Sequence, residues 1–213
     1  MHPLLNQYLA NLPQLHTWDE GKTWNTGGFN AQQLQAIYSY LMSQGESLSF
    51  IETGAGNSTL LFSFLAPARI ISIDPNPALF ERIRQQMRIY NLDVDKVVFI
   101  ADYSEWALPR LVEGYRIAPI FDVALIDGDH NYPNVFIDFF YLNYGLKAGG
   151  IIMVDDTQIY SCRELSLFLL HEPDFELVLD LGKIKLFKRH SDRRVLRGWD
   201  SGYNLKMTNT LTN

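Results

Sequence analysis

Short apolar runs alternate along the chain with longer segments of helical periodicity, and this alternation predicts most of its elements. Runs rich in isoleucine, valine and phenylalanine predict buried strands at 48–52, 70–73, 97–101, 120–126 and 151–154. Apolar residues at spacings of three and four predict helices at 2–12, 31–43, 77–90, 104–113, 135–144 and 161–170. Pro109 is expected to interrupt the fourth helix, because a proline inside a helix removes one backbone hydrogen bond.

The last part of the chain has a different pattern. Two runs that alternate apolar and polar residues, at 175–181 and 184–189, flank Gly182 and Lys183, which is typical of a β-hairpin. Strands joined by helices form parallel sheets that are covered on both faces. We therefore expect an α/β fold with a doubly wound, mostly parallel seven-stranded sheet that ends in a C-terminal antiparallel hairpin.

The segment after the first strand has the composition of a ligand-binding loop. Gly54 and Gly56 follow the strand, and helical periodicity starts at Thr59. Glycine lets the backbone turn sharply and lets a ligand approach it closely. The free N–H groups at a helix start then act as donors to that ligand. We interpret residues 48–58 as a nucleotide-binding loop.

All five strands that precede the hairpin stop at or next to an acid. These acids are Glu52, Asp74, Asp102, Asp127 and Asp155. Ligands of open α/β sheets bind outside the carboxyl ends of the strands, so this row of carboxylates marks the expected binding edge.

The row suits an adenosine-containing cofactor. A carboxylate at Asp74 suits the two hydroxyls of a ribose, and Asp102 with its following residues can meet an adenine. A dinucleotide fingerprint needs a third glycine where this chain has Thr59, and Glu52 would disfavour a pyrophosphate. S-adenosylmethionine carries a sulfonium and an ammonium without any phosphate, so it suits the acids better.

Composition and charge restrict the remaining classes. The chain of 213 residues is 47% hydrophobic and 20% charged, which predicts one folded domain with a full core. The single cysteine, Cys162, excludes an internal disulfide and a cysteine-based metal site. We expect no membrane span and, because a signal-peptide layout is missing at the N-terminus, a cytoplasmic location.

The net charge of −6 is unevenly distributed. Residues 183–213 hold eight lysines and arginines against two acids, so the acidic excess lies in the rest of the chain. An acidic body disfavours a broad nucleic-acid surface, and we expect no nucleic-acid partner. The basic tail is interpreted as a solvated segment, with contact to an anion or a second subunit left open.

These motifs together resemble the class I S-adenosylmethionine-dependent methyltransferases. The resemblance covers residues 30–190, leaving 1–29 as an N-terminal helix and loop that caps the substrate side and 191–213 as a basic tail. It implies a Rossmann-like methyltransferase fold and S-adenosylmethionine as cofactor. The cofactor-binding residues that it implies are Glu52, Thr53, Gly54, Ala55, Gly56, Ser58, Asp74, Pro75, Asp102, Tyr103, Ser104 and Asp127.

The ends of the fourth and fifth strands point to the reaction. Asp127, Asp155 and Asp156 are hard oxygen ligands at the ends of two strands that the fold can place side by side, which suits Mg²⁺. The segment Asp127-Gly128-Asp129-His130 resembles the metal-dependent small-molecule O-methyltransferases of the catechol and macrolide-sugar types. That resemblance implies Asp127, Asp155 and Asp156 as metal ligands and His130 as the catalytic base.

The expected reaction is therefore methyl transfer to a hydroxyl of a small molecule, with a divalent cation lowering the pKa of that hydroxyl. Two other classes stay open: a non-catalytic cofactor-binding or scaffold protein, and a nicotinamide-dependent dehydrogenase. Asp156 and Thr157 could also simply cap the next helix, and Asp129 could be a turn residue. The identity of the acceptor and the presence of a homo-oligomer are not readable from the sequence.

Overall fold

The computed structural model describes residues 2–17, 19–115, 119–191, 198, 200 and 202–211. Its strands form a seven-stranded sheet with the order β3-β2-β1-β4-β5-β7-β6, which confirms the expected mixed sheet. The chain forms two compact units, residues 1–107 and 108–213, which are described in turn. Part of the basic tail, including Arg193, Arg194 and Arg197, lies outside the described residues.

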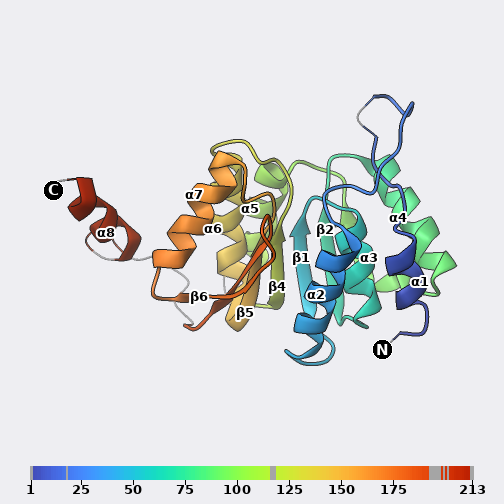
Figure 1. The fold of residues 1–213 in the computed structure, drawn as a ribbon, viewed down its shortest axis with the longest axis horizontal. Helices are drawn as coiled ribbons and strands as arrows, with labels where there is room; N and C mark the ends of the chain where they lie inside the picture. The colour runs from blue at the N-terminus through green and yellow to red at the C-terminus, as the bar shows by residue number, and fades with distance from the viewer. Residues whose placement is uncertain are drawn as a thin grey trace. The chain divides into compact units, whose positions relative to one another are not determined.

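The first unit is built on three parallel strands (Figure 1). They are β1 (Ser49–Thr53), β2 (Arg69–Ile73) and β3 (Val97–Ile100), with a short 3₁₀ helix η1 (Val94–Lys96) before β3. The helices of this unit are α1 (Leu5–Ala10), α2 (Ala31–Met42), α3 (Asn57–Phe64) and α4 (Pro77–Ile89). Helix α3 packs on β2 and lies between α2 and α4, so the loop that precedes α3 is held by buried neighbours.

The helix starts of this unit follow the polar signals in the sequence. Asn30 caps α2 with a reciprocal capping box, in which its side chain accepts the Gln33 N–H at 2.9 Å. Asn76 caps α4 and Pro77 is its first residue, as expected. Helix α1 is shorter than the expected 2–12 and is tied to α3 by a hydrogen bond from the Tyr8 hydroxyl to the Asn57 carbonyl oxygen, at 2.7 Å.

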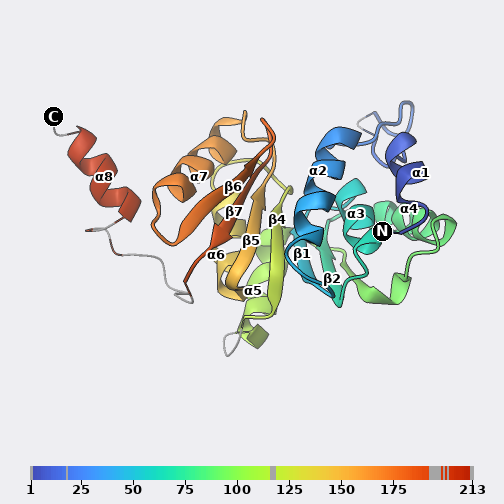
Figure 2. The same ribbon diagram turned by 60° about the horizontal axis from the view of Figure 1, so that its bottom comes forward.

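The second unit combines two parallel strands with the hairpin, as Figure 2 shows. Strands β4 (Phe121–Ile126) and β5 (Leu146–Val154) are parallel, while β7 (Lys185–Arg189) runs antiparallel to both β5 and β6 (Phe175–Asp180). Helices α6 (Asn134–Gly145) and α7 (Tyr160–His171) pack against each other and against this sheet. The predicted hairpin is therefore confirmed.

Two local expectations are wrong, and one helix was not predicted. Helix α5 (Ser104–Tyr115) continues through Pro109, although a proline in the helix interior removes one backbone hydrogen bond. Strand β5 begins at Leu146 rather than at 151, since the segment around Gly149 also continues the strand. A further helix, α8 (Gly202–Leu211), lies in the segment interpreted as a solvated tail, and it contacts α7.

None of the described helices is long and apolar enough to cross a membrane.

Candidate active site

The glycine loop of the first unit is shaped by two backbone constraints. Gly54 has φ +81°, a conformation that disfavours any side chain, and its N–H donates to the Ile73 carbonyl oxygen at 2.9 Å. A Cβ atom at Gly56 would lie 2.7 Å from Nε2 of His16, so a larger residue there would require that ring to move. The loop is therefore fixed to β2 on one side and covered by the N-terminal segment on the other.

Thr59 explains why the third glycine of the dinucleotide fingerprint is absent. Its hydroxyl accepts the Gly56 N–H at 3.1 Å and donates to Glu52, so it closes the loop and holds the acid at once. The Ser58 hydroxyl donates to the other Glu52 oxygen at 2.7 Å. A glycine at position 59 would lose both hydrogen bonds.

Glu52 lies beneath the loop rather than on its surface. The side chain is fully buried, and both of its oxygens accept hydroxyl hydrogen bonds. Burial raises the pKa of Glu52 to about 7, although the hydrogen bonds from Thr59 and Ser58 oppose this shift. The sequence predicted that this acid faces a cationic cofactor. In the structure the carboxylate of Glu52 instead accepts hydrogen bonds from Ser58 and Thr59 of the glycine loop.

Asp74 is joined to the same loop. Its carboxylate accepts the Asn76 N–H at 2.8 Å and a second hydrogen bond from the backbone N–H of Ala55. Burial raises the pKa of Asp74, and these two N–H groups partly offset the shift. Strand β2 thus brings the expected ribose-binding acid next to the loop, with Pro75 exposed beside it.

The segment after β3 presents aromatic surface beside an acid. Asp102 accepts the backbone N–H of Tyr103 at 2.9 Å, and Ser104 is buried at the start of α5. The side chains of Tyr103 and Trp106 are 58% and 62% exposed, so two large rings face solvent there. This arrangement suits a flat, apolar ligand face such as an adenine.

The N-terminal segment packs directly on the glycine loop. The Asn57 amide donates to the carbonyl oxygens of Pro13, at 3.0 Å, and Thr26, at 2.7 Å. Arg82 of α4 donates to the Leu15 carbonyl oxygen at 2.9 Å and stacks on Trp24, 4.8 Å from the ring centroid. The sequence predicted a cap at the N-terminus on the substrate side, and its contact with the glycine loop has no sequence signal beyond an asparagine in the first turn of a buried helix.

The second unit gathers the acids at the ends of β4 and β5. These strands pair with Ile126 opposite Val154, so the residues that follow, Asp127 and Asp155, emerge side by side. The Asp155 side chain is fully buried, and those of Asp127 and Asp156 are about one-fifth exposed, at 21% and 22%. The predicted convergence of the three carboxylates is therefore confirmed within this unit.

The ammonium of Lys183 lies among these carboxylates. Its Nζ is 3.2 Å from Oδ2 of Asp155 and 2.8 Å from Oδ1 of Asp156. Burial raises the pKa of Asp156, but the hydrogen bond and charge of Lys183 outweigh burial and leave that pKa below its usual value. Burial and the adjacent charge of Asp155 hold the pKa of Asp127 well above its usual range.

The backbone around Lys183 is fixed by the loop that carries the acids. The Thr157 N–H donates to the Lys183 carbonyl oxygen at 2.8 Å, and the Thr157 hydroxyl donates to the Gly182 carbonyl oxygen at 3.0 Å. Thr157 therefore secures the hairpin turn, and no side-chain cap is formed at the start of α7. Asp156 has φ +51°, a conformation that aspartate tolerates better than most residues.

His130 lies between two of the acids. Its Nε2 is 3.7 Å from Oδ1 of Asp127, and its Nδ1 is 3.6 Å from Oδ2 of Asp156. Nε2 is buried and has no hydrogen-bond partner in the described part of the chain. The Ser161 hydroxyl donates to the His130 carbonyl oxygen, which ties the histidine loop to the first turn of α7.

Asp129 is a turn residue. Its carboxylate accepts the Asn131 N–H at 2.9 Å and the Asn134 amide at 2.7 Å. It shapes the loop that carries His130 and takes no part in the acidic cluster.

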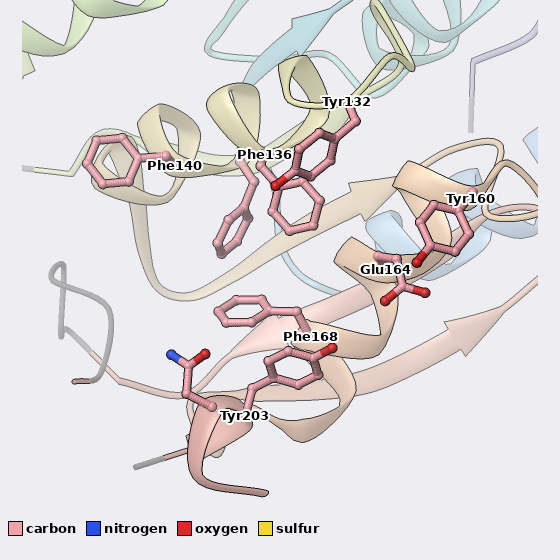
Figure 3. A pocket seen from close by; sticks show the side chains of 9 residues that line it. Tyr132, Phe136, Phe140, Tyr160, Glu164, Phe168 and Tyr203 are labelled. Carbon is pink, nitrogen blue, oxygen red and sulfur yellow. The ribbon is translucent and has the colours of Figure 1, made fainter. Parts of the chain in front are cut away.

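A cavity of about 830 Å³ lies next to the histidine loop, between α6, α7 and α8 (Figure 3). Tyr132 and Tyr160 form its edge, two residues after His130 and one residue before Ser161. Most of its lining is phenylalanine or tyrosine, and Glu164 adds one carboxylate; the lining residues are Tyr132, Phe136, Phe139, Phe140, Tyr160, Glu164, Phe168, Tyr203 and Asn204.

The acids do not fit a divalent cation in this arrangement. Among the described residues, no three histidine, cysteine, aspartate or glutamate side chains are placed to hold a metal ion. The ammonium of Lys183 lies where the carboxylates of Asp155 and Asp156 would meet an ion. Two members of the predicted metal set, Asp155 and Asp156, are thus already paired with a cationic side chain of the protein.

Lys183 was not predicted as a site residue, because an ammonium group is not a metal ligand. The predicted topology could have indicated Lys183, since the antiparallel strand β7 begins beside the end of β5. Lys185 pairs with Val154, which places the preceding turn beside Asp155 and Asp156.

A family model described as a methyltransferase domain matches residues 51–157, which include the glycine loop and all three aspartates. The chain belongs to this methyltransferase family. No curated protein sequence matches the methyltransferase significantly.

Solved structures show the same fold at low sequence identity. The O-methyltransferase TomG of Streptomyces achromogenes, in complex with S-adenosylmethionine, has a TM-score of 0.64 at 15% identity, over 77% of this chain and 82% of TomG. A Staphylococcus aureus protein assigned as a caffeoyl-CoA O-methyltransferase gives 0.62 at 13% identity, over 77% and 86%. A Clostridium thermocellum protein assigned as an rRNA methylase gives 0.58 at 16% identity, over 75% and 97%.

Glu52 makes the stability of the methyltransferase depend on pH. Its pKa is about 7 in the folded protein, against 4.5 for an unperturbed glutamate, so the folded state binds the extra proton between these values. The stabilisation from this proton is complete below pH 4.5, the unperturbed pKa, and is lost as pH rises through the folded-state pKa of about 7. Urea unfolding should show a loss on the order of 3 kcal/mol between about pH 4 and pH 8 that Glu52→Gln lacks.

Glu46→Gln is the matched control, because Glu46 is an exposed glutamate of the same unit. It should follow the wild-type profile. Parallel profiles for wild type and Glu52→Gln would show that Glu52 does not titrate with folding.

Proposed function

We propose that the methyltransferase transfers a methyl group from S-adenosylmethionine to a hydroxyl oxygen of a small molecule. The observation that carries this proposal is the buried Nε2 of His130, which lies beside Asp127 and has no hydrogen-bond partner among the described residues. An unpartnered imidazole nitrogen next to carboxylates is placed to accept a proton.

The cofactor is assigned to the first unit. Gly54 and Gly56 let it approach the backbone, Asp74 accepts hydrogen bonds from the ribose hydroxyls, and Tyr103 packs against the adenine. S-adenosylmethionine supplies an electrophilic methyl group when bound. Structural neighbours that are described in complex with S-adenosylmethionine or S-adenosylhomocysteine support this assignment.

The acceptor is assigned to the second unit. Nε2 of His130 accepts the proton of the hydroxyl, and Asp156, whose Oδ2 is 3.6 Å from Nδ1, orients the imidazole from its other side. The apolar part of the acceptor is assigned to the aromatic cavity, whose edge residues Tyr132 and Tyr160 are close in sequence to His130 and Asp156. This favours acceptors with a ring or another flat apolar group.

Metal assistance, as expected from the sequence, would need Asp127, Asp155 and Asp156 to exchange Lys183 for a divalent cation. The arrangement of these residues does not support that exchange, so no step of the proposed reaction uses a metal.

Calorimetry should show binding of S-adenosylmethionine that Asp74→Ala weakens by roughly 10- to 100-fold, because the ribose hydroxyls lose their charged acceptor. Asp95→Ala, an exposed acid of the same unit, should bind as the wild type does. Tight binding of NAD without binding of S-adenosylmethionine would contradict the proposal.

His130→Ala should lower kcat by roughly 100-fold or more, since general-base catalysis is lost. Methyl transfer is measured with labelled S-adenosylmethionine and a panel of phenols and sugars. His190→Ala, at an exposed histidine of the same unit, should keep the wild-type rate. If His130→Ala retains full turnover, another group accepts the proton.

Phe136→Ala should raise KM for a ring-containing acceptor by about 10-fold and leave kcat nearly unchanged, because the cavity loses apolar contact but no reacting group. Leu167→Ala serves as control, since Leu167 lies on α7 outside the cavity lining. Unchanged KM values in Phe136→Ala would show that the acceptor does not bind in the cavity.

A further inference from the structure

The acidic cluster of the second unit contains its own cation, and this has a consequence for how the hydroxyl is activated. Asp155 is fully buried, and Asp127 and Asp156 lie next to it. Three carboxylates so close together need positive charge, because buried negative charges repel each other and lose hydration. The ammonium of Lys183 supplies it at 3.2 Å and 2.8 Å from two of them.

Resting on the function proposed above, we propose that the ammonium of Lys183 replaces a divalent cation in the acceptor site. It pairs with Asp155 and Asp156, offsets part of their negative charge, and stabilises the negative charge that develops on the acceptor oxygen during methyl transfer.

Lys183 competes with a metal for one oxygen each of Asp155 and Asp156. Magnesium binds oxygen at about 2.0–2.1 Å and requires carboxylates that point at it with no cation in between. Here the Oδ2 of Asp155 and the Oδ1 of Asp156 both point at Nζ. An ion bound to these oxygens would lie against the ammonium, and the two positive charges would repel each other.

The placement of Lys183 is built into the fold. Gly182 has φ +80°, and its N–H donates to the Asp180 side chain at 2.9 Å, which fixes the turn before Lys183. Thr157 holds the Lys183 carbonyl oxygen from the loop that carries the acids. The turn and the acidic loop are thus one hydrogen-bonded structure within this unit.

Lys183 acts as a charge and not as the base. Burial lowers the pKa of Lys183, but the hydrogen bond to Asp156 and the charge of Asp155 outweigh burial and raise it above its usual value. Because Nζ lies 3.2 Å and 2.8 Å from two carboxylate oxygens, the site favours the ammonium form, and the proton of the acceptor passes to His130.

The reaction balances without a metal. The O–H bond of the acceptor breaks and its proton moves to His130, while an O–CH₃ bond forms and the S–CH₃ bond of the sulfonium breaks. The products are the methyl ether and S-adenosylhomocysteine, and His130 releases its proton to water.

The first test is metal binding, which needs neither acceptor nor turnover. Electron paramagnetic resonance should show no stoichiometric Mn²⁺ on the wild-type protein at millimolar Mn²⁺. Lys183→Ala frees the carboxylates and should bind one Mn²⁺ at least roughly 10-fold more tightly. Lys185→Ala should behave as the wild type, because Lys185 belongs to the same hairpin but pairs with Asp180.

The second test is turnover with the best acceptor of the panel, in EDTA. Wild-type kcat should not change on chelation, whereas Lys183→Ala should lose roughly 100-fold in kcat, the usual effect of removing one group that stabilises developing negative charge. Its affinity for S-adenosylmethionine should be unchanged. Lys183→Arg, which keeps the charge, or Mn²⁺ added to Lys183→Ala should restore part of the rate.

Stoichiometric Mn²⁺ on the wild type together with inhibition by EDTA would overturn the proposal, and so would full kcat in Lys183→Ala in EDTA. If Lys183→Ala does not fold, the wild-type Mn²⁺ titration and the kcat of Lys183→Arg decide. Absence of S-adenosylmethionine binding would contradict the proposed function. The Mn²⁺ titrations separately test whether the ammonium of Lys183 takes the position of a metal.

Discussion

The parallel pairing of β4 with β5 is the constraint on which the acidic cluster depends. Once Ile126 lies opposite Val154, the next residue of each strand is an aspartate, and the two carboxyl groups must be neighbours. Repulsion between them is costly in a buried position. The fold offsets it by keeping a proton on Asp127 more readily than usual and by bringing in Lys183.

The glycine loop of the first unit meets a similar constraint in a different way. Glu52 is fully buried at the end of β1, and no lysine or arginine is hydrogen-bonded to it among the described contacts. Two hydroxyl groups, from Ser58 and Thr59, take the role that an ammonium has in the other cluster. Burial raises the pKa of Glu52 to about 7, because the hydroxyl hydrogen bonds, which lower it, offset burial only in part.

The sequence predicted those features that depend on local pattern. The mixed sheet of an α/β methyltransferase, the Asn30 and Asn76 caps and the terminal hairpin follow from periodicity, turn residues and capping residues. The convergence of Asp127 with Asp155 also followed, because it needs only that two strands are parallel neighbours.

The features that were not predicted depend on contacts between distant residues. His16 covers Gly56 from 40 positions away, and Lys183 reaches Asp155 from 28 positions away. Neither residue has a local pattern that sets it apart from other histidines or lysines.

A tethered ammonium also differs from a metal in what it can recognise. Magnesium offers about six ligand positions, so it can hold two adjacent hydroxyls of one acceptor together with its carboxylates. An ammonium has three N–H donors and no accessible geometry for such a chelate. Two carboxylates are already hydrogen-bonded to Lys183, so under the proposed function an acceptor would gain little from a second hydroxyl. Specificity would then depend more on the fit of an apolar group to the aromatic cavity than on paired hydroxyls.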